Sequence, residues 1–371
     1  SGAQAVALGA VSGGCRFVAS YPMSPSTAVL TYMARNDRRF GLAVEQAEDE
    51  IAAVNMAIGA WYAGARAMVT TSGGGFALME EGVSLAGITE TPLVIHLGQR
   101  PGPATGMATR TEQADLDLAL YSGHGEFPRI IYAPGTIQEA FVLTHRAFDA
   151  ADRYQVPVFV LTDQYFIDSY YCVPSLGQEG LQVRDRTVPT QRDYRRYAFT
   201  EDGISPRGVP GFGEGLVVVD SHEHTEEGHI TEQIHMRNRM MEKRMGKIQA
   251  MAADCVPPSL LGPDDYRVLV IGWGSNYHIL AEAVGLLGRE DMAVLHFSQL
   301  FPLPPGTEEL LSRAERTIAV ENNYAGQMAR LLRTYTGFEV NHSIRKYDGR
   351  PFCSEDLAGR ILRVSGRRGR K

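Results

Sequence analysis

The sequence lacks the features that mark membrane-spanning, disulfide-rich and metal-binding proteins. Four cysteines are scattered over 371 residues, and no pair has the C-x-x-C spacing typical of zinc or iron–sulfur sites. Neither a signal peptide nor an apolar run near the ~18 residues that span a bilayer is visible. Scattered thiols suit a reducing compartment. We therefore expect a cytoplasmic protein with no disulfide framework, no membrane segment and no metal site of its own.

The sequence also lacks an excess of basic residues. Its 36 Lys and Arg face 43 Asp and Glu, so the formal net charge is -7. This balance argues against nucleic acid as the main partner, because phosphate binding needs a basic face. The one basic run is segment 367–371, which we interpret as a chain end rather than a binding patch. The chain begins at Ser1 rather than Met, which is compatible with processing or with a fragment of a longer protein.

Short apolar segments alternate with helical patterns over residues 1–175. Strands are expected at 17–20, 67–71, 93–97, 129–132 and 156–162, and helices at 4–14, 26–35, 48–63, 77–86 and 136–154. This alternation predicts an α/β domain whose parallel sheet is covered by helices on both faces. In such sheets, binding loops lie beyond the carboxyl ends of the strands.

The alternation stops over residues 176–263, which we interpret as a linker and a helical arm. An expected helix at 231–253 carries a stripe of Met and Ile side chains, which is more typical of a packing seam than of a ligand site. Alternation then resumes and predicts a second, smaller α/β domain over residues 264–371.

Two loops that follow expected strands carry polar side chains among prolines and glycines. In Tyr21-Pro22-Met23-Ser24-Pro25, two prolines bracket the hydroxyl of Ser24 and stiffen the backbone around it. The simpler interpretation is a strand-to-helix turn with Ser26 as N-cap. The second loop, 99–111, opens with Arg100, whose guanidinium is the usual bidentate partner of a carboxylate. Its composition favours anion recognition over a merely exposed arginine.

Glu50 leads an expected helix whose other residues are mostly small and apolar. An acid in a first helical turn is typically a solvated group that complements the helix dipole. However, three acids within Glu48-Asp49-Glu50 are more than a cap needs, and Glu50 adjoins the apolar run. A glutamate desolvated there would have a raised pKa and could hydrogen-bond a ring nitrogen of a ligand.

Three further motifs give weaker signals. Ser72-Gly73-Gly74-Gly75 lacks the Gly-Lys-Ser/Thr of a P-loop, and we expect close backbone packing there rather than anion binding. Gly272-Trp273-Gly274 follows a strand but lacks the third glycine of a dinucleotide fingerprint. The histidines of segment 222–229 match no familiar metal spacing, so we expect them to be solvated or hydrogen-bonded.

Taken together, these motifs resemble the α subunit of the 2-oxoacid:ferredoxin oxidoreductases, and most closely the 2-oxoglutarate branch. The resemblance covers nearly the whole chain. It rests on Tyr21-Pro22-Met23-Ser24-Pro25, the Glu50 helix, and segments 72–76, 99–110, 121–129, 223–229 and 321–327. It implies a thiamine-diphosphate fold, with a pyrimidine-binding domain over residues 1–175 and a transketolase-C-terminal-like domain over 264–371.

The resemblance also implies roles for individual residues. Glu50 matches the family glutamate that hydrogen-bonds N1′ of the aminopyrimidine, and Tyr21, Pro22 and Ser24 lie in the motif that meets cofactor and substrate. Ser24 stands where the family usually has Thr, so the hydroxyl is kept and a methyl group is lost. Arg100 and Thr109 match residues that recognise the 2-oxo acid. For Arg110, charge alone suggests contact with a second, distal carboxylate.

The resemblance further implies partners. The diphosphate and Mg²⁺ site and the [4Fe–4S] cluster belong to a β subunit in this family. Larger members add a γ domain, which precedes the α region on one chain or is a separate subunit. The whole enzyme converts a 2-oxo acid and coenzyme A into acyl-CoA, CO₂ and reduced ferredoxin, or runs in reverse. Two other hypotheses stay open at this point: a thiamine-dependent lyase or transferase without redox centres, and a non-catalytic dinucleotide-binding module.

Overall fold

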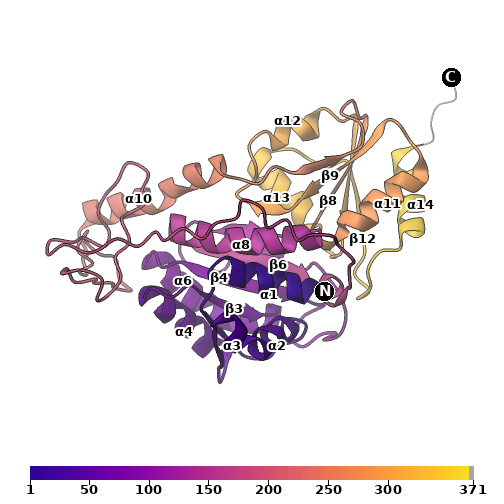
Figure 1. The fold of residues 1–371 in the computed structure, drawn as a ribbon. Coiled ribbons are helices and arrows are strands. Elements are labelled where there is room, and N and C mark those ends of the chain that lie inside the picture. Colours follow the sequence, from indigo (N-terminus) through magenta and orange to yellow (C-terminus); the bar gives the residue numbers. More distant parts are fainter. Residues whose placement is uncertain (367–371) are drawn as a thin grey trace.

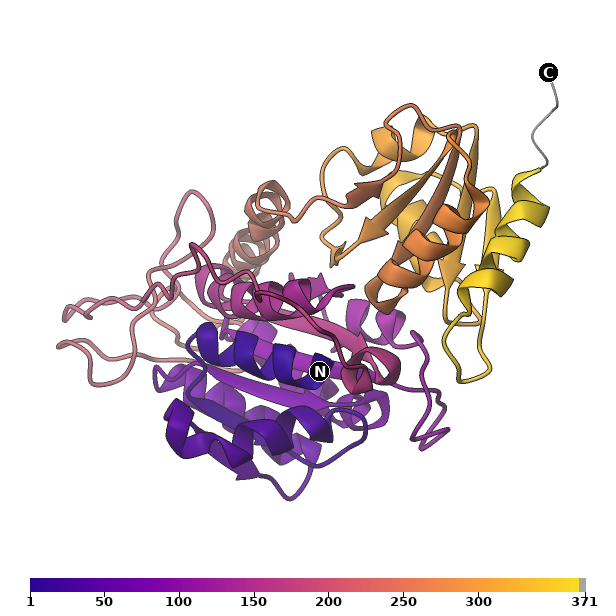
Figure 2. The same ribbon diagram turned by 45° about the vertical axis from the view of Figure 1, so that its right-hand side comes forward.

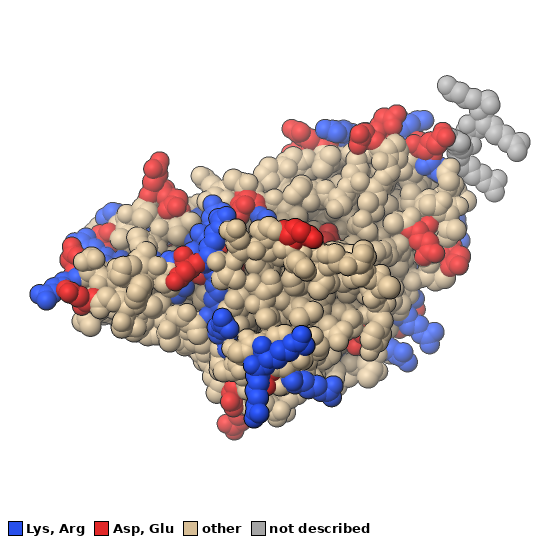
Figure 3. Space-filling view, in the orientation of Figure 1, with Lys and Arg blue, Asp and Glu red and all other residues tan. Residues whose placement is uncertain are grey.

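In the computed structural model, which describes residues 1–366, the chain folds into two β-sheets with their helices and a helical arm (Figure 1). The basic segment 367–371 lies outside the described residues. Within the described part, no helix combines the length and apolarity needed to cross a membrane. Figure 3 shows that acidic and basic side chains are mixed over the visible face.

The first sheet has seven strands in the order β10-β5-β6-β4-β3-β1-β2. All of its strands run parallel except β10, which pairs antiparallel with β5. Strands β3, β4 and β6 are buried along their whole length, as expected for a sheet covered on both faces. The strands are β1 (Phe17–Ser20), β2 (Ala43–Gln46), β3 (Ala67–Thr71), β4 (Leu93–Gln99), β5 (Ile130–Tyr132), β6 (Pro157–Asp163) and β10 (Gln299–Phe301).

Helices cover both faces of the first sheet. Helix α8 lies on one side of the strands, where it packs against α1, and α4 packs against α6 on the other side (Figure 1). The helices of this part are α1 (Gly2–Ser12), α2 (Thr27–Arg35), α3 (Asp37–Phe40), α4 (Glu50–Tyr62), α5 (Gly73–Phe76), α6 (Glu80–Ile88), α7 (Leu116–Leu120), α8 (Ile137–Tyr154) and α9 (Gln164–Asp168), with a 3₁₀ turn η1 (Ala77–Met79) between α5 and α6.

The second sheet has five strands in the order β12-β11-β8-β9-β7, of which only β7 is antiparallel. Figure 2 shows the second sheet at the upper right, above the first sheet, with the arm helix to its left. Its strands are β7 (Ser259–Leu261), β8 (Val268–Trp273), β9 (Met292–Phe297), β11 (Arg316–Glu321) and β12 (His342–Arg345). Its helices are η2 (Gly274–Asn276), α11 (Tyr277–Leu287), α12 (Thr307–Ser312), α13 (Gln327–Thr336) and α14 (Ser354–Ser365).

One strand from the second part of the chain joins the first sheet. Strand β9 belongs to the second sheet, yet β10 follows it after Ser298 alone and joins the edge of the first sheet beside Tyr132. The expected α/β alternation is confirmed in both parts. The short strands β2, β7, β10 and β12 were not expected, because strands of three or four residues are too short for a clear periodicity. The boundaries at 175 and 263 stay predictions.

The arm helix α10 (Ile234–Ala253) meets the first part of the chain through buried charges. Lys243 donates to both carboxylate oxygens of Glu90, at 2.7 and 2.8 Å, and Lys247 pairs with the same carboxylate. All three side chains are at most 2% exposed. The two ammonium groups hold the pKa of Glu90 well below its usual range, although burial acts in the opposite direction.

The buried face of α10 therefore differs from the expected Met seam. Only Met240 and Met251 of the stripe are fully buried, whereas Ile234 is 81% exposed. Lys243, Arg244 and Lys247 complete the buried face. The expected seam is thus met only in part, since Met241, Met245 and Ile248 are half-buried. A periodicity of apolar residues cannot show that Glu90 and Glu223 supply counter-charges from elsewhere in the chain.

Candidate active site

Glu50 is the first residue of α4, but it does not cap the helix. The neighbouring Asp49 is the N-cap, and its carboxylate accepts a hydrogen bond of 2.7 Å from the Ala52 N–H. Glu50 is turned inward and only 3% exposed. Its Oε1 has no hydrogen-bond partner within the described residues. Burial raises the pKa of this carboxyl above its usual range. Glu50 is thus the desolvated group that the sequence predicts, and one oxygen is free to bond a ligand.

The three glycines after β3 belong to the helical turn α5, and each faces a different neighbour. A methyl group on Gly75 would overlap Glu50 Oε1 and Thr71 Oγ1. One on Gly73 would lie 2.6 Å from Asp115 Oδ1, whereas one on Gly74 would sit at an ordinary 3.7 Å from the Ala104 carbonyl. The expectation of close backbone packing agrees with this geometry. Because α5 has no side chains at these positions, Glu50 and Asp115 both reach its backbone.

The Tyr21–Pro25 loop and the loop after β4 meet at one hydrogen bond. Arg100, which directly follows β4, donates from Nη1 to the Ser24 carbonyl at 2.6 Å. The peptide bond between Ser24 and Pro25 is cis, and Ser24 is exposed. Ser26 occupies the N-cap of α2, but its hydroxyl donates to the Met23 carbonyl instead of capping the helix. The loops that follow β1 and β4 therefore meet beyond the carboxyl ends of these strands, where binding loops of such sheets lie.

The remaining predicted residues lie further out. Tyr21 is 41% exposed and Pro22 is partly buried, both directly after β1. Thr109 and Arg110 are exposed at the far end of the loop, which we call the Arg100 loop (residues 100–110). There Arg110 packs against Gly349 of the second part of the chain.

Asp115 is a candidate that the sequence analysis missed. It stands at the N-cap position of α7, where an aspartate is ordinarily a capping residue, yet its side chain makes no capping bond. Its Oδ2 is buried without a hydrogen-bond partner in the described residues, as is the neighbouring Ser72 Oγ. Burial, aided by the charge of Glu112, raises the pKa of Asp115 to about 7, although the Arg100 charge acts in the opposite direction. Three unpartnered oxygens, on Glu50, Ser72 and Asp115, thus surround α5.

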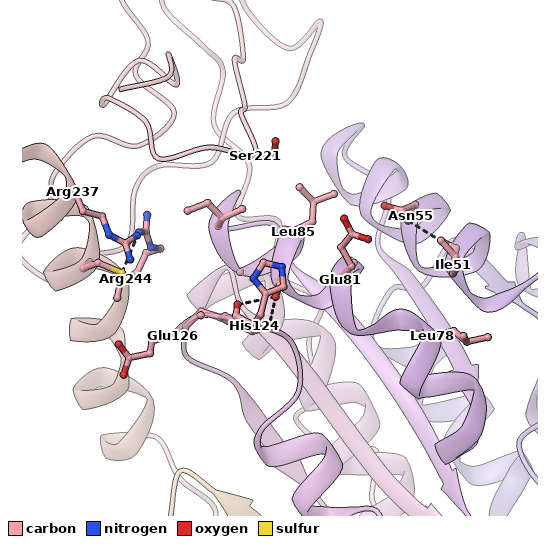
Figure 4. Close-up of a pocket in the computed structure, with 17 residues that line it drawn as sticks. Ile51, Asn55, Leu78, Glu81, Leu85, His124, Glu126, Ser221, Arg237 and Arg244 are labelled. Atoms are coloured by element: carbon pink, nitrogen blue, oxygen red, sulfur yellow. Dashed lines mark hydrogen bonds between the residues drawn. The ribbon is translucent and has the colours of Figure 1, made fainter. Parts of the chain in front are cut away.

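A cavity of about 660 Å³ lies next to this site, between α4, α6 and the arm (Figure 4). Ile51 and Leu78, which are 50% and 53% exposed, form part of its wall, and Arg237 and Arg244 face them from the arm. None of the predicted site residues lines it. The cavity is therefore a neighbour of the Glu50 site and not the site itself.

The histidine segment behaves as the sequence predicts. His224 is buried, donates a 3.0 Å hydrogen bond from Nδ1 to the His222 carbonyl, and lies with its ring centroid 3.7 Å from that of Tyr197. His222 is exposed and bonds Asp220. In residues 1–366, no group of three or more His, Cys, Asp and Glu side chains is arranged to hold a metal ion.

Comparison with known proteins identifies the family. Residues 8–243 match the family described as pyruvate flavodoxin/ferredoxin oxidoreductase, thiamine diphosphate-binding. The chain belongs to this family.

Similar members of the family include subunits of two named enzymes. The chain is 38% identical to the 2-oxoacid:ferredoxin oxidoreductase 1 α subunit of Sulfurisphaera tokodaii, over 98% of this chain and 61% of that protein. It is 32% identical to the 2-oxoglutarate synthase subunit KorA of Archaeoglobus fulgidus, over 89% and 88% of the two chains. The chain thus spans about three-fifths of the length of the first relative.

Solved structures agree with this assignment. The 2-oxoglutarate:ferredoxin oxidoreductase of Magnetococcus marinus, solved with 2-oxoglutarate, coenzyme A and succinyl-CoA bound, is 32% identical and superposes with a TM-score of 0.92. The match covers 97% of this chain and 64% of that chain. A split-gene transketolase, at 14% identity and a TM-score of 0.51, shares the fold alone. The predicted thiamine-diphosphate fold with a transketolase-like relationship is confirmed.

The packing of Glu50 on α5 can be tested in this protein with two variants of the α5 glycines. Gly75→Ala would force the new methyl group against Glu50 and Thr71, and should lower the free energy of unfolding by about 2 kcal/mol. Gly74→Ala is the matched control, because its methyl group meets only an ordinary contact. Thermal unfolding of both variants measures the difference. Equal melting temperatures would contradict the close approach of Glu50.

The buried carboxyl of Asp115 predicts a pH-dependent stability. The folded state keeps its proton up to about pH 7, whereas the unfolded state loses it near the ordinary aspartate pKa of 3.8, so this group destabilises the fold increasingly between pH 4 and 7. Asp115→Asn should therefore be more stabilising at pH 8 than at pH 4.5, by about 3 kcal/mol. Denaturant unfolding at the two pH values tests this, with the exposed Asp265→Asn as control. The same gain at both pH values would refute it.

Proposed function

We propose that this chain is the α subunit of a 2-oxoacid:ferredoxin oxidoreductase and supplies half of its active site. The enzyme would convert a 2-oxo acid and coenzyme A into acyl-CoA and CO₂, with the electrons passing to ferredoxin, or catalyse the reverse reaction. The observation that carries the proposal is Glu50, a buried carboxylate whose Oε1 is unpartnered and which approaches the side-chain-free turn α5. The names of the relatives point to the same reaction.

Glu50 is suited to hold thiamine diphosphate at its aminopyrimidine ring. A carboxyl that burial makes more basic can hold a proton between Oε1 and a ring nitrogen, which is the role that the family resemblance assigns to it at N1′. Tyr21, Pro22 and Ser24 lie on the loop from the neighbouring strand β1 and would form part of the same pocket. When bound, the cofactor supplies the electron sink for cleaving the bond beside the 2-oxo group.

Arg100 is suited to hold the substrate carboxylate. Its Nη1 bonds the Ser24 carbonyl, so the guanidinium lies at the junction of the two loops and keeps further N–H donors for an anion. The Ser24 hydroxyl is exposed at the same junction and would contact the 2-oxo acid head. Thr109 would complete recognition from the distal part of the Arg100 loop.

Arg110 would select a substrate with a second carboxylate. It is exposed ten residues beyond Arg100 on the same loop, and it packs at its Cβ against Gly349, which leaves the guanidinium free to turn toward the substrate. A second carboxylate distinguishes 2-oxoglutarate from pyruvate. KorA relatives and the solved Magnetococcus marinus enzyme are both named for 2-oxoglutarate.

Partner chains would supply the rest of the enzyme. The Sulfurisphaera tokodaii relative is named as an α subunit and the Archaeoglobus fulgidus relative as a subunit, which implies at least one further subunit. We expect a β subunit to bring the diphosphate and Mg²⁺ site and the [4Fe–4S] cluster, and ferredoxin to accept the electrons. The chain spans only part of the longer relatives, so a γ domain or subunit also belongs to the proposal. The four free cysteines suit a cytoplasmic setting.

The proposal can be tested on the complex purified anaerobically from its own cells. Viologen reduction is followed with coenzyme A and a panel of 2-oxo acids, and we expect reduction with 2-oxoglutarate. Glu50→Gln should abolish turnover while the complex still assembles, because the amide cannot hold the proton as the carboxyl does. No reduction with any acid, despite bound thiamine diphosphate and an intact partner, would instead indicate a non-redox lyase or transferase.

The role of Arg110 predicts a substrate-dependent loss. Arg110→Ala should lower kcat/KM for 2-oxoglutarate by about 100-fold and change that for pyruvate much less, because only the first substrate carries a distal carboxylate. The control is Arg333→Ala. Arg333 is an exposed arginine of α13 and pairs with Glu339, which lies after that helix. Equal losses on both substrates would remove this role from Arg110.

A further inference from the structure

The second sheet has no residue in the proposed active site, yet its binding crevice is filled. In open α/β sheets, ligands bind beyond the carboxyl ends of neighbouring strands where the chain order reverses. Strands β8 and β11 form this point, because β9 lies on one side of β8 and β11 on the other. The side chain of Gln113, which comes from the first part of the chain, lies there.

Gln113 is bonded to both strand ends. Its Nε2 donates to the carbonyl of Trp273, the last residue of β8, at 2.9 Å. Its Oε1 accepts from Asn276 Nδ2 at 2.9 Å and from the N–H of Asn322, just after β11, at 3.1 Å. The backbone of Gln113 bonds Asn322 and Asn323 as well. The side chain is only 1% exposed. Gln113 therefore occupies the crevice as a ligand would.

The glycine motif of this sheet serves the same contact. Gly274 has a φ of +55°, and a Cβ there would lie 3.0 Å from Gln113 Nε2. Gly272-Trp273-Gly274 thus gives room to a glutamine of the same chain at the place where a dinucleotide would otherwise bind. The hypothesis of a dinucleotide-binding module loses its structural basis here, because Gln113 fills the position.

Gln113 lies three residues after the Arg100 loop, and its neighbours are held too. The Thr111 N–H donates to the Gly349 carbonyl at 3.2 Å, and the Thr111 hydroxyl donates to Asp163, which also accepts from Ser275. Gln327 bonds the Ala114 carbonyl at 2.7 Å. The segment 111–114 is therefore anchored along its length to the carboxyl-end loops of the second sheet.

Within the Arg100 loop, the Met107 N–H donates to the Pro101 carbonyl and the Arg110 N–H to the Met107 carbonyl, both at 3.0 Å, but most of the loop is exposed. Residues 102–107 are exposed, and so are Thr109 and Arg110. At one end the loop leaves β4 and is tied to Ser24 through Arg100. At the other end it enters the anchored segment. A loop so exposed keeps a fixed shape only if both ends are held.

We propose that Gln113 is a positioning residue for substrate recognition, and that the second sheet serves to hold the distal end of the Arg100 loop. This inference rests on the proposed function, because it gives the loop its substrate. Gln113 touches no substrate; it sets where Thr109 and Arg110 stand relative to Arg100. A carboxylate contact is made in the ground state and in the transition state alike, so a loosened loop raises KM more than it lowers kcat.

The test compares Gln113→Ala with Gln299→Ala in the purified complex. Gln299 is also a buried glutamine, 2% exposed, but it bonds Val256 and Pro302 and not the loop. For Gln113→Ala we expect KM for the 2-oxo acid to rise about tenfold with kcat changed less than about threefold. Amide hydrogen exchange over residues 100–110, measured without substrate, should become faster. Gln299→Ala should change neither quantity.

A milder variant covers the case in which Gln113→Ala does not fold. Asn276→Ala removes one donor to Gln113 and should shift KM and loop exchange in the same direction by a smaller amount. Unchanged KM and unchanged loop exchange in a folded variant, or the same changes in Gln299→Ala, would overturn the proposal. The exchange measurement needs no turnover, so it decides the role of Gln113 even if the wild-type complex reduces no viologen and the proposed function fails.

Discussion

The close approach of side chains to the helical turn α5 is the constraint on which the site depends. Gly73 and Gly75 leave no side-chain volume on two sides of the turn, and Asp115 and Glu50 enter that space. Both carboxyls lose solvent there without gaining a full set of hydrogen bonds, so burial raises the pKa of each. Buried polar atoms without partners are rare in folded proteins because they cost free energy. Their clustering at α5 supports the proposal that a ligand supplies the missing bonds.

The rest of the fold holds the loops around this turn in place. The arm is joined to the segment just after α6 by Glu90, which lies between Lys243 and Lys247. In this buried cluster, loss of one partner would leave uncompensated charge. The second sheet is joined to the first by β10 and by the segment around Gln113. Polar contacts of this kind require a particular geometry, whereas apolar packing tolerates many. They therefore give three separate parts of the chain one defined arrangement around the site.

Much of the fold and part of the site could be predicted from local patterns. The long buried strands β3, β4 and β6 produce apolar runs bounded by turn residues, and these were expected within one or two residues. Glu50 was recognisable because an acid stands next to an apolar helical run. Short edge strands such as β2 give too few residues for a periodicity. Asp115 resembles an ordinary N-cap in sequence, and only its close approach to Gly73 and its buried, unpartnered oxygen make it distinctive.

The sequence by itself determined the two α/β parts, the family and the residues that the family motifs carry, because these depend on local periodicity and on short runs of fixed residue types. Tertiary structure alone decided which side chains meet. It brought Arg100 to Ser24, Lys243 to Glu90 and Gln113 to Trp273, pairs that are separated by 76, 153 and 160 residues. No local pattern encodes such a pairing, because the free energy of a buried hydrogen bond or ion pair depends on the partner that the completed fold delivers.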